Sequence, residues 1–298
     1  MEWAVTAAGV LIVLAALRDV FHTLWYPSGR GRISTAVAAL VWRTFQRLPL
    51  GPRLGALSGP LTMVVVVGTW AGLVLVGFAL IYWPHLPEEF SYAPGLLPGR
   101  RGGFLDAFYL SLVTLCTLGF GDIVPTADWL RLVTPLEGLF GFGLLTAAVT
   151  WVLQVYPALR RRRALAHRLT LLHRSDTAAV LPELNVVVAA QLLDGLASDV
   201  TGALLDLSQY EVTYYFLETD EDTALYASVH YALRLAEQGG GDQRPDVRLA
   251  AAQLSGALAD LARLIDREFL KVGGDPATVL GSYARDRARV PGRRPGGR

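Results

Sequence analysis

The sequence predicts an all-α membrane protein that carries a soluble helical region after its membrane part. Hydrophobic residues make up 52% of the 298 residues and the mean hydropathy is +0.37, which is more apolar than an ordinary soluble domain. Three long apolar stretches lie before residue 157, and the periodicity of amphipathic helices begins at Ala164. These observations indicate several membrane spans followed by a helical domain.

Three stretches are long enough to cross a bilayer, because a membrane helix needs about 20 apolar residues. Residues 59–83 contain no charged side chain and are the clearest candidate. Residues 3–26 have aromatic side chains at both ends, as membrane interfaces favour, and residues 129–156 contain one acid, Glu137. We expect all three stretches to span.

Arginines predict which ends of these helices face the cytoplasm, where Lys and Arg are in excess. Residues 27–58 contain five arginines and no acid, and four arginines, Arg160–Arg163, follow the third span. The expected protein is therefore a multi-pass protein of the plasma membrane. Its N-terminus lies outside, an amphipathic stretch at 33–48 lies on the inner surface, and the C-terminal domain is cytoplasmic.

Beyond Ala164, leucines and valines recur every three or four residues, as in helices with one apolar face. Three glycines at 239–241, followed by Pro245, separate two such helices. The tail is rich in Arg, Gly and Pro, a composition typical of disorder. We therefore expect four regions: an N-terminal helix with the amphipathic segment at 1–58, the other two spans at 59–157, a cytoplasmic helical domain at 158–284 and a disordered basic tail at 285–298.

Residues 104–125 lie between the second and third spans, and their apolar part is too short to cross a bilayer as a helix. Residues 104–116 can form about three helical turns, with Asp106 near the start, where the helix dipole favours an acid. The helix would end at the strip Thr117-Leu118-Gly119-Phe120-Gly121. We expect this segment to be re-entrant.

The strip at 117–121 has the features of a cation-coordinating backbone. Gly119 and Gly121 can adopt positive φ, which lets consecutive carbonyls point the same way, so that rings of carbonyls replace water around a cation. Irregular backbone at membrane depth is tolerated only when it is buried in protein or lines a water-filled path. Four copies around an axis would satisfy that condition.

Residues 114–122, Thr-Leu-Cys-Thr-Leu-Gly-Phe-Gly-Asp, resemble the signature of the potassium-channel pore-domain family, in its bacterial type with two membrane helices and one pore loop. The resemblance extends over residues 59–156 in the order outer helix, pore helix, filter and inner helix. It implies a K⁺-selective homotetramer, to which this chain adds an N-terminal transmembrane helix and a helical C-terminal domain.

The resemblance assigns K⁺ coordination to a run of filter residues: Thr117, Leu118, Gly119, Phe120 and Gly121. Thr117 would offer both its hydroxyl and its carbonyl, and Asp122 would stand at the outer mouth. Val113 occupies a position where some family members carry a buried acid. Phe120 replaces a commoner tyrosine, which removes a hydroxyl that could tether the filter to the pore helix.

The last span contains an acid and three glycines whose roles stay open on the sequence alone. Gly138, Gly141 and Gly143 are candidates for the hinge that opens the gate of the family's inner helix, or they allow close helix packing. Glu137 either lines the cavity or, as is typical of the family, is packed and hydrogen-bonded behind the pore helix.

Two groups of charges near the membrane also have alternatives. We expect Arg18 and Asp19 to form an ion pair within the membrane, or Arg18 to extend its side chain to the interface. A voltage sensor is not expected, because it stacks several arginines on one helix. The arginines Arg160–Arg163 either anchor the last span or bind anionic lipid.

Other functions are a poorly selective cation channel and a non-conducting, membrane-anchored signalling protein. An enzyme is not expected, because the chain has no Walker-type loop, no His-Glu-x-x-His and no Gly-x-Ser-x-Gly. No cofactor is expected besides permeant K⁺, since Cys116 is the only cysteine and the five histidines lack metal-ligand spacing. The formal net charge of +1 argues against nucleic-acid binding.

Overall fold

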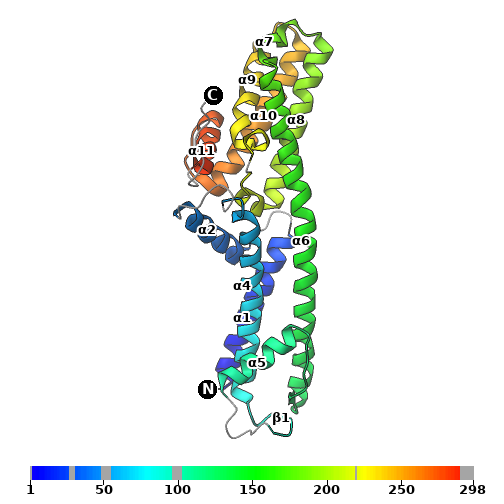
Figure 1. The fold of residues 1–298 in the computed structure, drawn as a ribbon, viewed down its shortest axis with the longest axis vertical. Helices are drawn as coiled ribbons and strands as arrows, with labels where there is room; N and C mark the ends of the chain where they lie inside the picture. Colours follow the sequence, from blue (N-terminus) through cyan, green and yellow to red (C-terminus); the bar gives the residue numbers. More distant parts are fainter. Residues whose placement is uncertain (1, 27–30, 48–54, 96–102, 219, 289–298) are drawn as a thin grey trace. The chain divides into compact units, whose positions relative to one another are not determined.

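The computed structural model describes residues 2–26, 31–47, 55–95, 103–218 and 220–288, and this part of the chain is helical apart from one pair of short strands (Figure 1). The chain divides into two compact units, one of Met1–Ala38 with Met63–Leu153 and one of Ala39–Thr62 with Gln154–Arg298. Three helices contribute to both units: α2 (Arg32–Arg47), α4 (Ser58–Tyr82) and α6 (Asp128–Arg174). The units thus cut across the ranges expected from the sequence, because part of α2 and the start of α4 pack with the C-terminal region.

The first unit contains the apolar helices. The three predicted spans correspond to α1 (Glu2–Leu24), to α4 with the following turn η1 (Trp83–His85), and to the first part of α6. α5 (Phe104–Leu115) is the short helix predicted between the last two spans. α4 is apolar on every face, as expected of a helix surrounded by lipid and other membrane helices.

α1 packs closely against α4 through two glycines. A Cβ at Gly9 would lie 2.4 Å from the carbonyl oxygen of Gly77, and a Cβ at Gly77 would lie 2.6 Å from Cγ2 of Val13. Small residues at such crossings let helix backbones approach in membranes, where dispersion contacts replace the hydrophobic effect. The N-terminal helix is therefore an integral part of the first unit.

Asp19, near the end of α1, holds the start of α2. Its carboxylate accepts the backbone N–H groups of Ile33 at 2.8 Å and Ser34 at 3.0 Å. It also accepts the indole N–H of Trp70 at 2.8 Å. A carboxylate at a helix N-terminus satisfies N–H groups that have no partner within the helix. Asp19 is thus bonded to α2 and α4, and the pair expected with Arg18 is not the contact that the structure shows.

Two short strands join the segments on either side of α5. β1 (Phe90–Tyr92) pairs antiparallel with β2 (Ile123–Pro125), and Ser91 lies opposite Val124. Strands of three residues are too short for alternation in the sequence to predict them.

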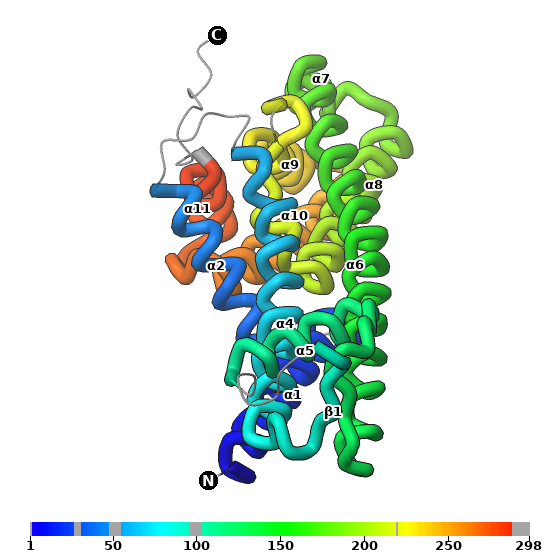
Figure 2. The backbone as a smooth tube through the Cα atoms, turned by 60° about the horizontal axis from the view of Figure 1, so that its bottom comes forward, coloured from blue at the N-terminus to red at the C-terminus, as the bar shows by residue number. Residues whose placement is uncertain are grey.

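The second unit contains a helical bundle of α8 (Val186–Gln209), α9 (Leu225–Gly240), α10 (Pro245–Ile265) and the C-terminal part of α6. α10 packs along both α8 and α9, and Figure 2 shows these helices side by side. The predicted break at 239–241 is confirmed, since α9 ends there and Pro245 starts α10. Shorter elements complete the unit: α7 (Thr177–Val180), η3 (Leu181–Glu183), η4 (Glu211–Tyr215), η5 (Glu221–Thr223), η6 (Asp266–Leu270) and α11 (Pro276–Ala288).

α8 is also long and apolar enough to cross a membrane by length and composition. Its contacts, however, are those of an amphipathic bundle helix. Asp199 pairs with Arg168 at 2.5 Å and Asp206 pairs with Arg161 at 2.5 Å, while Leu193 is fully buried. Charges on one face and leucines on another are the pattern predicted from the sequence for a helix of this domain.

The predicted disordered tail is corrected for its first residues. Residues 285–288 belong to α11, and the Arg287 side chain is fully buried. Its guanidinium carbon lies 4.3 Å from the ring centre of Tyr214 and 5.3 Å from that of Trp42. Such cation–π contacts are strongest when they are desolvated, so they order this end of the chain. Residues 289–298 lie outside the described residues.

Candidate functional site

The strip at 117–121 lies directly after α5, whose end turns the chain into it. Asp106 stands in the first turn of α5, as predicted. At the other end, the N–H of Thr117 bonds the carbonyl of Thr114 at 2.9 Å. The N–H of Leu118 bonds the carbonyl of Val113, also at 2.9 Å. α5 therefore directs its C-terminal end, which carries partial negative charge, toward the strip.

Every second residue of the strip has a left-handed backbone. The φ angles are +56° at Thr117, +54° at Gly119 and +73° at Gly121. The positive φ predicted for the two glycines is confirmed, whereas the positive φ at Thr117 was not predicted. A threonine in this conformation is strained by about 1–3 kcal/mol, and such strain is concentrated at functional sites. Inverting the backbone at alternate residues turns consecutive carbonyls to the same side.

One side of the strip is open in a single chain. All residues from 116 to 121 are exposed, including 60% of Leu118 and 67% of Phe120. Val113 and Ser111 on α5 are buried behind the strip. Among the described residues, the strip is thus backed by α5 on one side and uncovered on the other.

Glu137 is fully buried behind α5, where it joins three helices. It accepts a hydrogen bond from the Tyr82 hydroxyl at 2.7 Å, and its other oxygen is hydrogen-bonded to Oγ of Ser111. Ser111 has one hydroxyl proton but lies within hydrogen-bond distance of two acceptors, Glu137 and the carbonyl of Leu75 at 2.9 Å. The cluster is fully satisfied when Glu137 carries a proton and donates it to Ser111. Of the two roles left open by the sequence, the packed acid fits this geometry.

Asp122, directly after the strip, is tied to α5. The hydroxyl of Tyr109 donates a hydrogen bond of 2.7 Å to its carboxylate. Tyr109 lies one helical turn before Val113, on the same face of α5. This hydrogen bond links α5 to the end of the strip. A tyrosine hydroxyl at position 120 could make such a link, and Phe120 cannot.

The backbone after the strip is fastened to β1 and its neighbours. The N–H of Ala93 bonds the carbonyl of Asp122, and the N–H of Thr126 bonds the carbonyl of Glu89, both at 2.8 Å. The side chain of Glu89 also accepts the indole N–H of Trp129 at 3.0 Å. Both ends of the strip are therefore held by groups of the same chain.

Comparison with known proteins assigns this arrangement to a family. Residues 69–156 match the family model described as ion channel. A stretch of 55 residues, 17% of this chain, is 42% identical to two-pore potassium channel 5 of Arabidopsis thaliana and covers 14% of that protein. Residues 69–156 form a pore domain of this ion-channel family. In the arrangement predicted from the sequence, α4 corresponds to the outer helix, α5 to the pore helix, 117–121 to the filter and α6 to the inner helix.

Two bacterial relatives extend the comparison. The chain is 31% identical over 179 residues to the uncharacterized membrane protein YdjJ of Bacillus subtilis (strain 168). The aligned stretch covers 58% of this chain and 50% of YdjJ. It is 34% identical over 89 residues to protein LctB of Geobacillus stearothermophilus, 28% of this chain and 66% of LctB. The chain thus spans about half the length of YdjJ and a small part of the plant channel. No solved structure matches it significantly.

The three glycines of the inner helix have different surroundings. A Cβ at Gly141 would lie 2.0 Å from the carbonyl oxygen of Leu115, at the end of the pore helix. At Gly138 the nearest atom would be 3.7 Å away, and at Gly143 none lies within 4 Å. Close packing explains Gly141. The inner helix itself is continuous from Asp128 to Arg174, so a hinge at the other two glycines stays a prediction.

The four arginines at 160–163, in the later part of α6, divide into two kinds. Arg162 is buried, pairs with Glu218 and donates to the carbonyl of Thr213 at 2.6 Å, and Arg161 pairs with Asp206. Arg160 and Arg163 are exposed. Arg161 is exposed as well, with 57% of its side chain accessible, so Arg162 is the one of the four that is withdrawn into the protein.

The sequence singled out the strip at 117–121 and Glu137 as candidates, but it missed the groups that hold them. Tyr82, Ser111 and Tyr109 have hydroxyls on apolar helices, where a polar group needs a partner. A hydroxyl on an apolar helix therefore predicts that a hydrogen bond exists, but it does not predict which group is the partner. The structure describes no group of three or more His, Cys, Asp or Glu side chains that could hold a metal ion within the ranges given above.

Proposed function

We propose that this chain is one subunit of a homotetrameric, potassium-selective channel that conducts K⁺ passively across the plasma membrane. The observation that supports this most directly is the filter, in which alternate residues have positive φ at the end of a short helix between two membrane-length helices. No enzymatic activity and no cofactor besides permeant K⁺ is part of the proposal.

The filter would bind K⁺ through backbone oxygens. The carbonyls of Thr117, Leu118, Gly119 and Phe120, together with the Thr117 hydroxyl, would replace the ion's hydration shell, and Gly121 with Asp122 would form the outer mouth. Carbonyl oxygens suit a monovalent cation because several partial charges compensate dehydration without holding the ion too tightly. The negative end of the pore-helix dipole would add to this attraction.

A tetramer follows from the open side of the filter. Irregular backbone with exposed Leu118 and Phe120 is unfavourable in contact with lipid, where each unsatisfied peptide group costs several kcal/mol. Four chains around an axis would place the open sides together along a hydrated path. The Tyr109–Asp122 bond and the Glu137 cluster would then hold each filter strand from behind.

The proposed orientation places the N-terminus outside and the C-terminal domain in the cytoplasm. Arginines near α2 and after the third span support it. Gating would occur at the inner helices, with Gly138 and Gly143 as hinge candidates, and the C-terminal bundle would bias it because α6 contributes to both units. Arg160 and Arg163 would contact anionic lipid.

The experiment is K⁺ uptake into liposomes that contain the purified protein, compared with Na⁺ uptake under the same gradient. Gly119→Ala should abolish selective K⁺ flux, because alanine is strained at a φ of +54°. Gly68→Ala is the matched control, since a Cβ at Gly68 of the outer helix meets no atom within 4 Å.

Each result decides between the candidate functions. K⁺ flux that exceeds Na⁺ flux, and that only Gly119→Ala removes, supports the proposal. Equal K⁺ and Na⁺ flux would establish a poorly selective cation channel. Absence of flux both in the full chain and after removal of residues 164–298 would favour a non-conducting signalling protein.

A further inference from the structure

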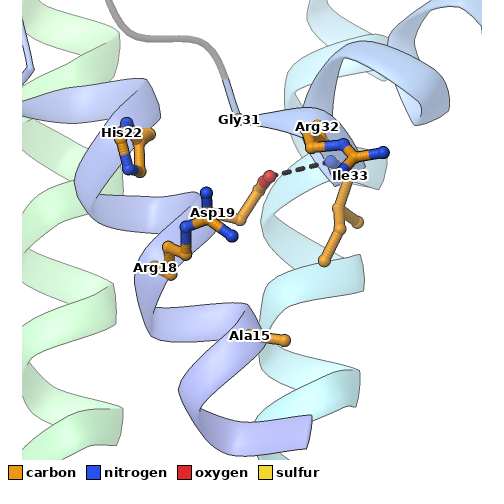
Figure 3. Close-up of a pocket in the computed structure, with 7 residues that line it drawn as sticks. All are labelled: Ala15, Arg18, Asp19, His22, Gly31, Arg32 and Ile33. Atoms are coloured by element: carbon orange, nitrogen blue, oxygen red, sulfur yellow. Dashed lines mark hydrogen bonds between the residues drawn. The ribbon is translucent and has the colours of Figure 1, made fainter.

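A cavity of about 390 Å³, with charged groups in a mostly apolar lining, lies where α1 ends and α2 begins, within the first unit. Its charged lining comes from Arg18, Asp19 and His22 of α1 and from Arg32 at the start of α2. Figure 3 shows Arg18 and Arg32 on either side of the Asp19 carboxylate. Because α1 is a membrane-length helix and α2 is amphipathic, this cavity belongs at the boundary between lipid and water.

Asp19 does not neutralise the two arginines. Its carboxylate is 5% exposed and already accepts three hydrogen bonds, from the N–H groups of Ile33 and Ser34 and from the indole of Trp70. Among the described residues, neither Arg18 nor Arg32 forms an ion pair or a hydrogen bond. The cavity therefore offers two guanidinium groups that have no anionic partner of their own.

Gly31 makes the cavity wall possible. A Cβ at this position would lie 2.2 Å from Oγ1 of Thr23, 2.3 Å from Oγ of Ser34 and 2.7 Å from Cγ of Asp19. Thr23 and Ser34 are themselves hydrogen-bonded at 2.9 Å. The backbone thus approaches α1 more closely than any residue with a side chain would allow, and Arg32 and Arg18 line the same cavity. The site is built by packing between two helices.

An apolar track leads away from the cavity along α1. Leu11, Leu14 and Ala15 precede Arg18 by seven, four and three residues, so all four share one face of the helix. Leu11 is 67% exposed and Leu14 is 55% exposed. In a bilayer this face meets acyl chains directly below the two arginines.

We propose that this cavity binds the phosphate group of a membrane phospholipid, with an acyl chain along Leu11 and Leu14. Guanidinium groups bind phosphate oxygens by paired, charge-assisted hydrogen bonds and are the side chains best suited to this contact. A soluble phosphate would use the same two arginines but not the apolar track. The lipid would join the end of α1 to the amphipathic helix α2.

The test uses the full-length protein, stripped of lipid in detergent and titrated with palmitoyl-oleoyl phosphatidylglycerol in native mass spectrometry. Arg18→Gln with Arg32→Gln should weaken binding about tenfold or more, because both charge-assisted contacts are lost. The control is Arg43→Gln with Arg47→Gln, which removes the same charge from exposed positions of α2 outside the cavity. Arg32→Gln alone should weaken lipid binding by a smaller factor. Because Arg32 is exposed, this substitution should leave the fold intact.

The outcomes separate the sources of phosphate. Weaker binding in the Arg18 and Arg32 variants, with the control unchanged, supports the proposal when millimolar inorganic phosphate does not displace the lipid. Equal loss in both double variants would mean that lipid binds by surface charge alone and would overturn it. Displacement by inorganic phosphate, or no loss in any variant, would equally overturn the assignment to a lipid.

Discussion

Two buried glutamates, one in the pore domain and one in the C-terminal bundle, are held by different chemistry. Glu137 is bonded to the hydroxyls of Tyr82 and Ser111, whereas Glu218 is paired with Arg162. A charge is costly inside a membrane, while a bundle in water can bury an ion pair whose remaining groups are hydrogen-bonded. Glu137 is therefore held by hydroxyl groups in a packed apolar site, and Glu218 by buried cations.

The cations around Glu218 decide its ionisation. Burial alone would raise the pKa of this carboxyl, but the guanidinium groups of Arg162 and Arg287 outweigh burial and hold the pKa below its ordinary value of 4.5. Arg162 also donates to the carbonyl of Phe216 at 3.0 Å, and so does Arg287 at 3.1 Å. Glu218 is thus the counter-charge of two buried arginines.

The largest expected effect comes from removing that counter-charge. Glu218→Gln should lower the free energy of unfolding of the bundle by about 3 kcal/mol, because the buried guanidinium group of Arg162 loses its anionic partner. Thermal unfolding of the full-length protein in detergent, followed by circular dichroism, measures this. Asp206→Asn is the control. It breaks the pair with Arg161, whose side chain is 57% exposed, and should cost less than about 1 kcal/mol. Equal effects would contradict the comparison.

Gly141→Ala tests the role of packing in the pore domain. The added methyl group would meet the backbone carbonyl of Leu115, which cannot turn aside, so we expect a loss of about 2 kcal/mol and a weakening of the proposed tetramer in size-exclusion chromatography. Gly143→Ala, where no atom lies within 4 Å, should keep the assembly or stabilise it, because alanine favours helix. A tetramer that tolerates Gly141→Ala would show that this contact is loose.

Substitutions of Glu137 sharpen the comparison between the two acids. Glu137→Gln should change stability by less than about 1 kcal/mol, because an amide can accept from Tyr82 and donate to Ser111. Glu137→Ala should cost about 2 kcal/mol, since both hydroxyls lose their partner in an apolar site. The same thermal assay measures both. A large loss in Glu137→Gln would mean that Glu137, like Glu218, needs its negative charge.

The smallest expected effect is a dependence of bundle stability on acid. The pKa of Glu218 is lower in the folded state than its ordinary value of 4.5. The unfolded state therefore binds more protons than the folded state when the pH is near 4.5. The stabilisation is therefore complete above about pH 4.5 and is lost as the pH falls toward the folded value. The melting temperature should therefore drop as the pH falls below about 4.5, and this drop should be smaller in Glu218→Gln. An identical drop in both proteins would remove Glu218 as its cause.

The sequence predicts features that depend on neighbouring residues and misses those that depend on distant ones. The three spans follow from length and hydropathy, and the positive φ of Gly119 and Gly121 follows from local sterics. The bonds that support the filter join Glu137 to a tyrosine 55 residues away, a partner that no local pattern specifies. The burial of Arg287 is missed for the same reason. The composition of the segment around it resembles that of a disordered tail, while the aromatic rings that it contacts are distant in the sequence.

The central claim is that the filter at 117–121 selects K⁺, and the reversal potential tests it most directly. Currents through the purified protein in a planar bilayer, with K⁺ on one side and Na⁺ on the other, should reverse far from zero in the direction set by K⁺. Gly119→Ala should abolish this current or shift its reversal to zero, while Gly68→Ala leaves it unchanged. A reversal at zero in the unmodified protein would contradict potassium selectivity.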